Sequence, residues 1–154
     1  CVLAPFAAVS AQRVNLVATS GLSSSGTLCD PFACAPASIT AARGYNLGLT
    51  LAGAPGQPHL LILGNAPAQC VAVPGINGSL IVQPQHIVPL SLSWGRIYVS
   101  GGQSVCASWM GFQSVPLAAS LPIGLQILMQ VVAPVSSPTG AQWTFSGAVQ
   151  LTIQ

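Results

Sequence analysis

Alternation of apolar and polar residues with a period of two is the feature that most restricts how this chain can fold. The run from Tyr45 to Leu51 places apolar residues at every second position, as do the runs from Ile123 to Val131 and from Val149 to Ile153. Successive side chains of a strand point to opposite faces, whereas an amphipathic helix needs apolar spacings of three and four. The pattern therefore predicts strands with one buried face.

Turn signals divide the chain into many short segments of this kind. Further strands are expected at Val14 to Val17, His59 to Leu63, Leu80 to Val82, Ile87 to Leu92, Arg96 to Val99 and Gln142 to Phe145. Turns are expected at Ala54 to Gly56, Pro74 to Gly78, Gly101 to Gly102 and Ser136 to Gly140. Short strands with Gly and Pro between them are typical of sandwiches and barrels. We predict an all-β fold, a single antiparallel β-sandwich that is Ig-like or jelly-roll-like, with an extended N-terminal segment.

The N-terminal part differs in composition from the remainder. Residues 1–11 look like the tail of a secretory signal, since an apolar stretch ends in small residues at Val9 to Ala11. Ser20 to Gly26 is small and polar and is expected to be a flexible connector. We therefore divide the chain into an apolar extension with its connector, residues 1–26, and a β-sandwich domain, residues 27–154, that includes a Cys29 to Cys34 loop.

Charged residues make up only 3% of the 154 residues, and the chain has no Lys and no Glu. A paired-carboxylate glycosidase, an oxygen-ligated cation site and a lysine-dependent catalyst all need residues that are missing. Three scattered arginines form no basic patch for nucleic acid, and no apolar run reaches the length of about 20 residues that a spanning helix requires. We expect no enzymatic activity, no cofactor, no nucleic-acid partner and no integration into a membrane.

The five cysteines are Cys1, Cys29, Cys34, Cys70 and Cys106, and none belongs to a C-x-x-C pair. We predict a Cys29 to Cys34 disulfide around the turn-forming insert and a Cys70 to Cys106 disulfide between strands; four buried thiols are the alternative. Cys1 then remains free, lipidated or available for an intermolecular bond. Disulfides favour an extracellular or cell-surface location.

Two sets of side chains suggest chemistry. Asp30 and either His59 or His86 could join a serine in a hydrolase triad, but the chain contains no G-x-S-x-G motif to hold that serine. A zinc site at the two histidines with two thiols would need closer spacing, so structural histidines are the simpler interpretation. No catalytic or metal-binding residue is therefore assigned.

Aromatic side chains and hydroxyl groups raise the question of glycans. A sugar-binding face would use the aromatic residues, although packing in the core or an interface is commoner; they are Tyr45, Trp94, Tyr98, Trp109 and Trp143. Asn77 begins an N-x-S glycosylation motif on a predicted turn. The serine-rich segments Ser23 to Ser25 and Ser136 to Thr139 are alternative sites for O-linked glycans.

The segment from Gly44 to Gln154 carries a family resemblance. Its marks are the stretches Gly48 to Pro55, Leu60 to Gly64, Ile123 to Pro134 and Phe145 to Ile153. These resemble a β-sandwich domain found near the C-terminus of secreted proteins of planctomycete-type bacteria, which implies an exported structural module and supplies no catalytic residue. The N-terminal extension is similar in logic to that of donor-strand pilins, in which such a segment completes the sheet of the next subunit.

These features predict an extracellular structural subunit that polymerises into a filament or pilus-like appendage by N-terminal strand exchange. A monomer with so few charges lacks the repulsion that keeps proteins dispersed, whereas in a polymer much of the surface is covered. The residues expected to contact a neighbouring copy are Val2, Leu3, Phe6, Val9, Val14 and Leu16. The alternative function is a secreted module that binds polysaccharide or a cell surface through its aromatic residues. The expected partners are copies of the chain itself, with glycans as a further possibility.

Overall fold

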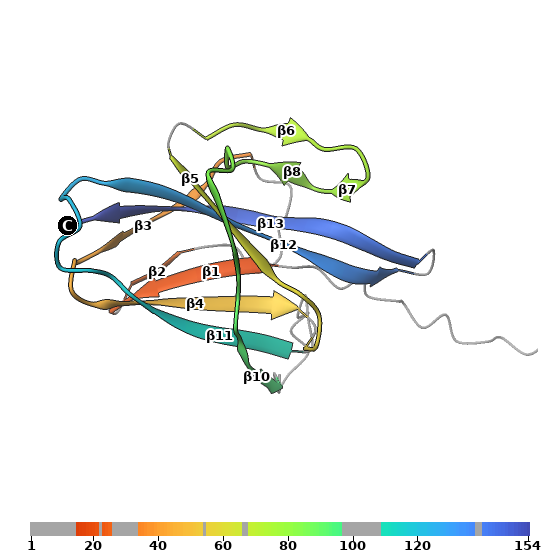
Figure 1. Ribbon diagram of the computed structural model, residues 1–154, viewed down its shortest axis with the longest axis horizontal. Coiled ribbons are helices and arrows are strands. Elements are labelled where there is room, and N and C mark those ends of the chain that lie inside the picture. Colours follow the sequence, from red (N-terminus) through yellow and green to blue (C-terminus); the bar gives the residue numbers. More distant parts are fainter. Residues whose placement is uncertain are drawn as a thin grey trace, which may run out of the picture.

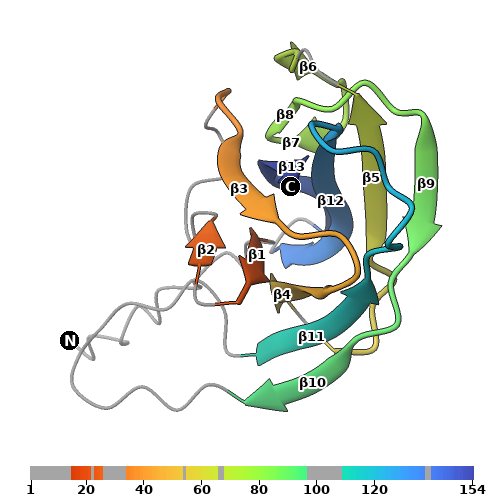
Figure 2. The same ribbon diagram turned by 90° about the vertical axis from the view of Figure 1, so that its left-hand side faces the viewer.

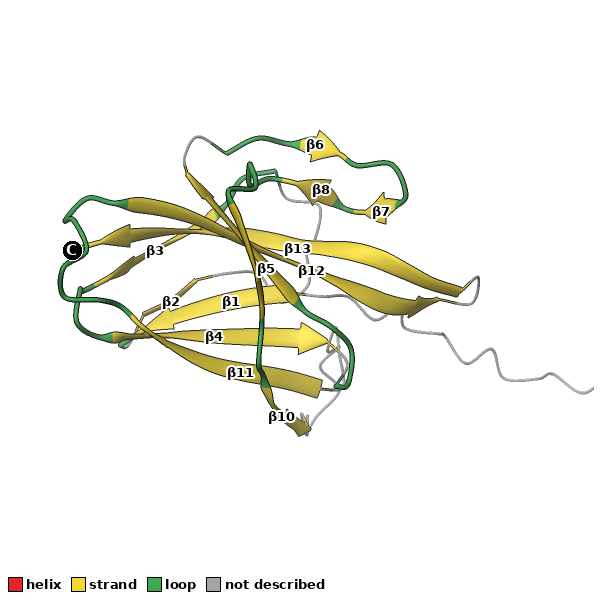
Figure 3. Ribbon diagram, in the orientation of Figure 1, coloured by secondary structure: helices red, strands yellow, loops and turns green. Residues whose placement is uncertain are grey.

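The computed structural model describes residues 15–21, 23–25, 34–53, 55–65, 68–96, 109–137 and 140–154. Within these ranges the chain forms thirteen strands and no helix (Figure 3). The predicted all-β sandwich is therefore confirmed. No helix that could cross a membrane is found in the described part of the chain.

Two sheets face each other across the core (Figure 1). The first sheet has five strands in the order β10-β11-β4-β1-β2. Its strands are β1 (Asn15–Ser20), β2 (Ser23–Ser25), β4 (Asn46–Gly53), β10 (Ser93–Arg96) and β11 (Trp109–Pro116).

The second sheet has six strands, five of them in the order β3-β13-β12-β5-β9, with β7 paired to β13. Its strands are β3 (Ala37–Ala41), β5 (Leu60–Asn65), β7 (Ile76–Asn77), β9 (His86–Pro89), β12 (Gln126–Ser137) and β13 (Gly140–Ile153). The short strands β6 (Val71–Ala72) and β8 (Ser79–Leu80) pair with each other. Most neighbours are antiparallel, as predicted, but β3 and β7 both run parallel to β13.

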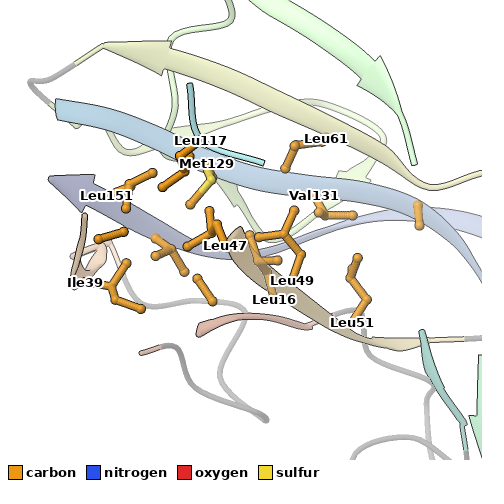
Figure 4. Packing of buried hydrophobic residues seen from close by; sticks show 14 of the residues in the cluster. Leu16, Ile39, Leu47, Leu49, Leu51, Leu61, Leu117, Met129, Val131 and Leu151 are labelled. Carbon is orange, nitrogen blue, oxygen red and sulfur yellow. The ribbon is translucent and has the colours of Figure 1, made fainter. Parts of the chain in front are cut away.

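The core lies between the inner faces of the two sheets (Figure 4). Every second residue of β4 points inward, and Leu47, Leu49 and Leu51 are at most 2% exposed. Met129 and Val131 of β12 meet them from the second sheet and are 3% and 0% exposed. Burial of alternate residues is the result that the period-two pattern predicted.

A second apolar cluster lies on the outer face of the second sheet, beneath the segment that contains β6, β7 and β8. Ile81 and Val82 follow β8, are fully buried, and pack with Leu128 and Phe145 of the long β12–β13 hairpin. Residues 68–82, of which β7 also pairs with β13 at the edge of the second sheet, therefore form a third layer over part of the sandwich (Figure 1).

One glutamine joins this third layer to the sheet. The Gln130 side chain is fully buried, and its Oε1 accepts hydrogen bonds from the N–H groups of Ile81 (2.9 Å) and Val82 (3.4 Å). Its Nε2 donates to the carbonyl oxygens of Ser79 and Ser146, each at 2.8 Å. Both ends of the amide are satisfied, as a buried polar group requires.

The two long sides of the sandwich differ. On one side the chain passes directly from β9 in the second sheet to β10 in the first, so residues 86–96 connect the sheets (Figure 2). On the other side β2 and β3 lie next to each other without pairing. The sandwich is thus bridged on one side only.

The N-terminal boundary of the sandwich differs from the prediction. The domain was expected to begin at residue 27, after a flexible connector, but β1 and β2 already belong to the first sheet. Ser20 pairs with Ser23 at the turn of the β1–β2 hairpin, where Gly21 has a φ of 59°. The small polar residues therefore form a tight turn and a short strand, for which Gly at positive φ is suited.

Candidate functional site

The outer edge of β3 is the principal candidate site. The Gln154 N–H donates to the Ala41 carbonyl oxygen at 2.9 Å, and the Arg43 N–H donates to the Gln154 carbonyl oxygen at 3.2 Å. In a parallel pair, alternate residues of a strand bond to the same neighbour. The N–H and C=O groups of Ser38 and Thr40 consequently point away from β13. Among the described strands, none pairs with them.

A hollow of about 230 Å³ lies along this edge, between β2 and β3. Its walls contain Ser24, Ser38, Thr40 and Thr152, and the buried Ile39 contributes an apolar contact. None of these residues is charged. An edge with unpaired backbone groups, small hydroxyl side chains and an adjacent apolar residue fits an extended strand, because added strands bind through backbone hydrogen bonds and alternate side chains.

The opposite edge of the same sheet is formed by β9 and has a different character. All four of its side chains are exposed, including Ile87 at 58% and Val88 at 42%. The Leu90 N–H donates to the His59 carbonyl oxygen, and since successive N–H groups alternate in direction, the Pro89 nitrogen faces away from β5. Proline at such a position blocks further strand pairing. The edge of β9 is therefore an apolar surface, and β3 provides the edge suited to pairing.

Of the six residues predicted to mediate polymerisation, one lies in the described part of the chain and five lie outside it. Leu16 lies in β1, pairs with Leu51 of β4 and is only 1% exposed, so it belongs to the core of its own chain. The expectation that it inserts into a neighbouring copy is wrong, because its removal would open the first sheet. The remaining candidates lie outside the described residues; they are Val2, Leu3, Phe6, Val9 and Val14.

The structure also corrects the cysteine pairing. Cys34 forms a disulfide with Cys70, with their Cα atoms 5.4 Å apart, so the predicted partners of both residues were wrong. The reason is topological: β3 and β7 align along the same edge of β13, and the antiparallel pairing of β6 with β8 returns Cys70 to the level of Ile81, beyond the end of β7 and toward the start of β3. Cys1, Cys29 and Cys106 lie outside the described residues.

The aromatic side chains do not gather on one face. Trp94 packs against His59, with ring centroids 5.1 Å apart, and the Arg96 guanidinium lies 4.9 Å from the ring centroid of Trp109. Tyr45 precedes β4, near the end of β13, whereas Trp143 lies ten residues before that end. At about 3.3 Å per residue this separates them by roughly 30 Å. Tyr98 lies outside the described residues.

His59 is a buried structural residue in this arrangement. Its side chain is 3% exposed, and Nδ1 lies 2.8 Å from the Gln57 carbonyl oxygen. Because a carbonyl only accepts, Nδ1 carries the proton and Nε2 remains without a hydrogen-bond partner. Burial lowers the pKa of His59 from its ordinary value of 6.5, and the hydrogen bond to Gln57 opposes that shift.

The residues considered for a catalytic triad, a zinc site or glycosylation do not form a common site within the described residues. His86 lies exposed in β9, Asp30 lies outside the described residues, and no three metal-ligating side chains gather in the described part. Asn77 is exposed in β7, and its carbonyl oxygen accepts a hydrogen bond from Thr144 Oγ1 at 3.4 Å. Ser23 to Ser25 forms β2, and Ser136 and Ser137 end β12. Asn77 is thus accessible for the predicted glycosylation, which stays a prediction.

Comparison with known proteins supplies no assignment. No protein-family model matches the chain, and no curated protein is similar to it. The resemblance to the planctomycete-type domain therefore stays a prediction, and function has to be argued from the geometry.

Proposed function

We propose that this chain is an extracellular structural subunit that joins copies of itself into a filament or pilus-like appendage. The observation that carries the proposal is the outer edge of β3, where the backbone groups of Ser38 and Thr40 meet no described strand. Natural proteins usually protect such edges with charges or proline. No residue from Ala37 to Ala41 is charged or a proline.

The strand that occupies this edge comes from residues 1–14 of a neighbouring copy. Val2, Leu3, Phe6 and Val9 supply apolar side chains that gain free energy when removed from water. Leu16 is excluded from the exchange because its own sandwich needs it. The contact joins two different surfaces, so it leaves one of each unused and can repeat without closing.

The chemistry of the chain supports an extracellular location. The Cys34 to Cys70 disulfide is compatible with an oxidising compartment. With a charged content of 3%, a dispersed monomer has little electrostatic repulsion to keep it soluble. Assembly removes surface from water and so makes this composition tolerable.

Two variants test the assembly edge. Thr40→Pro removes an outward N–H while the bonds between β3 and β13 remain, because those bonds use the alternate residues. Thr40→Val keeps the N–H and serves as the matched control. Deletion of residues 1–14 removes the proposed inserting strand and leaves β1 intact. All three are compared with the unaltered chain by negative-stain microscopy and sedimentation velocity.

We expect filaments from the unaltered chain and from Thr40→Val, and folded monomers from Thr40→Pro and from the deletion variant. Circular dichroism verifies that the sheet content is retained. Filaments that persist in the deletion variant would contradict strand exchange, and filaments that persist in Thr40→Pro would contradict the use of the β3 edge. A monodisperse unaltered chain that binds polysaccharide would support the alternative function.

A further inference from the structure

The start of β3 is held in place differently from its end. At the end of the strand, the Ala41 carbonyl oxygen accepts a hydrogen bond from the Gln154 N–H at 2.9 Å. Residues 34–36, which precede the strand, form no backbone hydrogen bond with the described part of the chain. Instead, the disulfide joins Cys34 to Cys70 and so ties this segment to the third layer. The disulfide is therefore the anchor for the start of β3.

The other end of this anchor is itself fixed to the second sheet. Gln69, the residue before Cys70, donates its N–H to the Ile81 carbonyl oxygen at 2.8 Å. Ile81 is fully buried, and its own N–H donates to the Gln130 side chain of β12 at 2.9 Å. A continuous series of contacts therefore leads from β12 through the third layer to the start of β3.

The anchored end carries part of the proposed assembly edge. Ser38 and Thr40 supply the outward N–H and C=O groups, and Ser38 is the second residue of β3. Among the described strands, β3 pairs with β13 alone, and the end of such a strand frays easily unless the chain beyond it is held. Without the disulfide, an incoming strand has to order the start of β3 before it can pair with Ser38. That ordering weakens binding.

The disulfide is accessible to reducing agents, since Cys34 and Cys70 are both exposed. Exposed disulfides are reduced more readily than buried structural ones. A dithiol opens the bond by exchange: its first thiolate attacks one sulfur to form a mixed disulfide, and its second thiolate then displaces the protein sulfur. The protein gains two electrons and two protons as two thiols, and the dithiol is oxidised to a disulfide.

We infer that the Cys34 to Cys70 disulfide is a redox switch that controls assembly. The oxidised chain presents an ordered β3 edge, whereas the reduced chain stays folded and accepts an incoming strand far more weakly. This inference rests on the proposed function, because it concerns the regulation of the same edge. A disulfide-containing oxidant, which is itself reduced to two thiols, closes the bond and permits assembly. Filaments therefore form only in an oxidising compartment.

Sedimentation of the full chain, with and without dithiothreitol, measures the monomer concentration that remains in equilibrium with filaments. We expect reduction to raise this concentration about tenfold to a hundredfold, because the backbone hydrogen bonds of Ser38 and the order of the edge are lost. The double variant Cys34→Ser, Cys70→Ser should show the raised value under both conditions. A variant with every other cysteine replaced by serine keeps the disulfide and should respond to dithiothreitol as the unaltered chain does.

Two further measurements separate the loss of the anchor from a general loss of stability. Leu49→Ala removes a buried side chain from the first sheet and lowers the free energy of unfolding, but it leaves the disulfide intact and should not change assembly. In the monomer, hydrogen exchange at the Ile39 N–H should become faster on reduction. Its rate should also become independent of low urea concentrations, because local fraying exposes little surface.

The outcomes distinguish the inference from the proposed function. Equal assembly of the oxidised chain, the reduced chain and the double serine variant would overturn the inference and leave the proposed function standing. A loss of assembly in Leu49→Ala as large as that in the double serine variant would also overturn it, because stability and not the anchor would then control assembly. Absence of filaments from the oxidised, unaltered chain would contradict the proposed function and the inference with it.

Discussion

Replacement of Gln130 by leucine should destabilise the protein far more than the same replacement elsewhere on β12. Leucine has a similar volume but forms no hydrogen bond, so the N–H of Ile81 and the carbonyl oxygens of Ser79 and Ser146 lose their side-chain partner. Ile81 and Ser146 are fully buried, so water cannot replace the amide without opening the third layer. Each buried polar group left without a hydrogen-bond partner lowers the free energy of unfolding by about 1–3 kcal/mol.

Allowing for partial relaxation, the three groups together should lower the free energy of unfolding by about 3–5 kcal/mol. That is a large share of the roughly 5–15 kcal/mol typical of a domain. For a chain of this size the expected fall in Tm is on the order of 10 °C. Urea denaturation followed by circular dichroism measures the free energy directly.

Gln126→Leu is the matched control, since Gln126 lies on the same strand with an exposed side chain. Its effect should stay within about 0.5 kcal/mol. Hydrogen exchange should also show faster exchange at the Ile81 N–H in Gln130→Leu. A loss of stability within about 1 kcal/mol of the control would refute the reasoning, because the amide would then not be joining the third layer to the sheet.

Three further predictions follow from local geometry. Replacing Cys34 and Cys70 together by serine should lower the free energy of unfolding by about 4 kcal/mol in the chain-entropy model, since the bond closes a loop of sequence separation 36. Non-reducing peptide mapping of the unaltered chain should recover this pair. A different partner for either residue would contradict the assignment. Because folding lowers the pKa of His59, this residue should not reduce the free energy of unfolding above pH 6.5, and it should reduce it progressively as the pH falls below 6.5. Urea midpoints measured against pH should show this fall, and His59→Phe should flatten it. Gly64→Ala should destabilise by about 1–3 kcal/mol because a Cβ there would overlap a main-chain carbonyl oxygen, whereas Gly95→Ala, with its nearest neighbour at 3.9 Å, should have little effect on the thermal midpoint.

The strands that were predicted well are those whose inner positions are all filled by apolar residues. β4 and the last part of β13, from Val149 to Ile153, are of this kind. The start of β12 was placed too early, because Gly124 has a φ of 82° and Ile123 lies in a turn. The period-two pattern continues through that turn, so it could not mark the boundary.

Strand β11 was not predicted, and its burial explains why. Its inner face contains Gly111 and Gln113, while its outer face contains the exposed Phe112, so hydrophobicity and burial do not coincide. Gly111 is needed because a Cβ there would lie 3.2 Å from the Trp94 ring and 3.0 Å from Leu92. A residue chosen for its small size cannot reveal a buried position through hydropathy.

The unpaired edge of β3 could not be predicted from the sequence either. Which groups of Ser38 and Thr40 point outward depends on the parallel pairing of β3 with β13, far away along the chain. The same pairing decides the disulfide, because it brings the segment before β3 to the edge that β7 also follows. Composition and alternation predict elements, but parallel pairing between distant segments has no local signal.

The directions of β1 and β13 have a mechanical consequence. β1 begins at Asn15, opposite Ala52, and β13 ends at Ile153 beside Ala41, so the two strands leave the sandwich at opposite ends (Figure 1). A pulling force applied at Asn15 and Gln154 therefore acts along both strands. Since the hydrogen bonds between antiparallel strands run across the strand direction, the five register pairs from Asn15 to Thr19 share this load and resist it together. The strands are thus loaded in shear, so their hydrogen bonds must break together and not one after another.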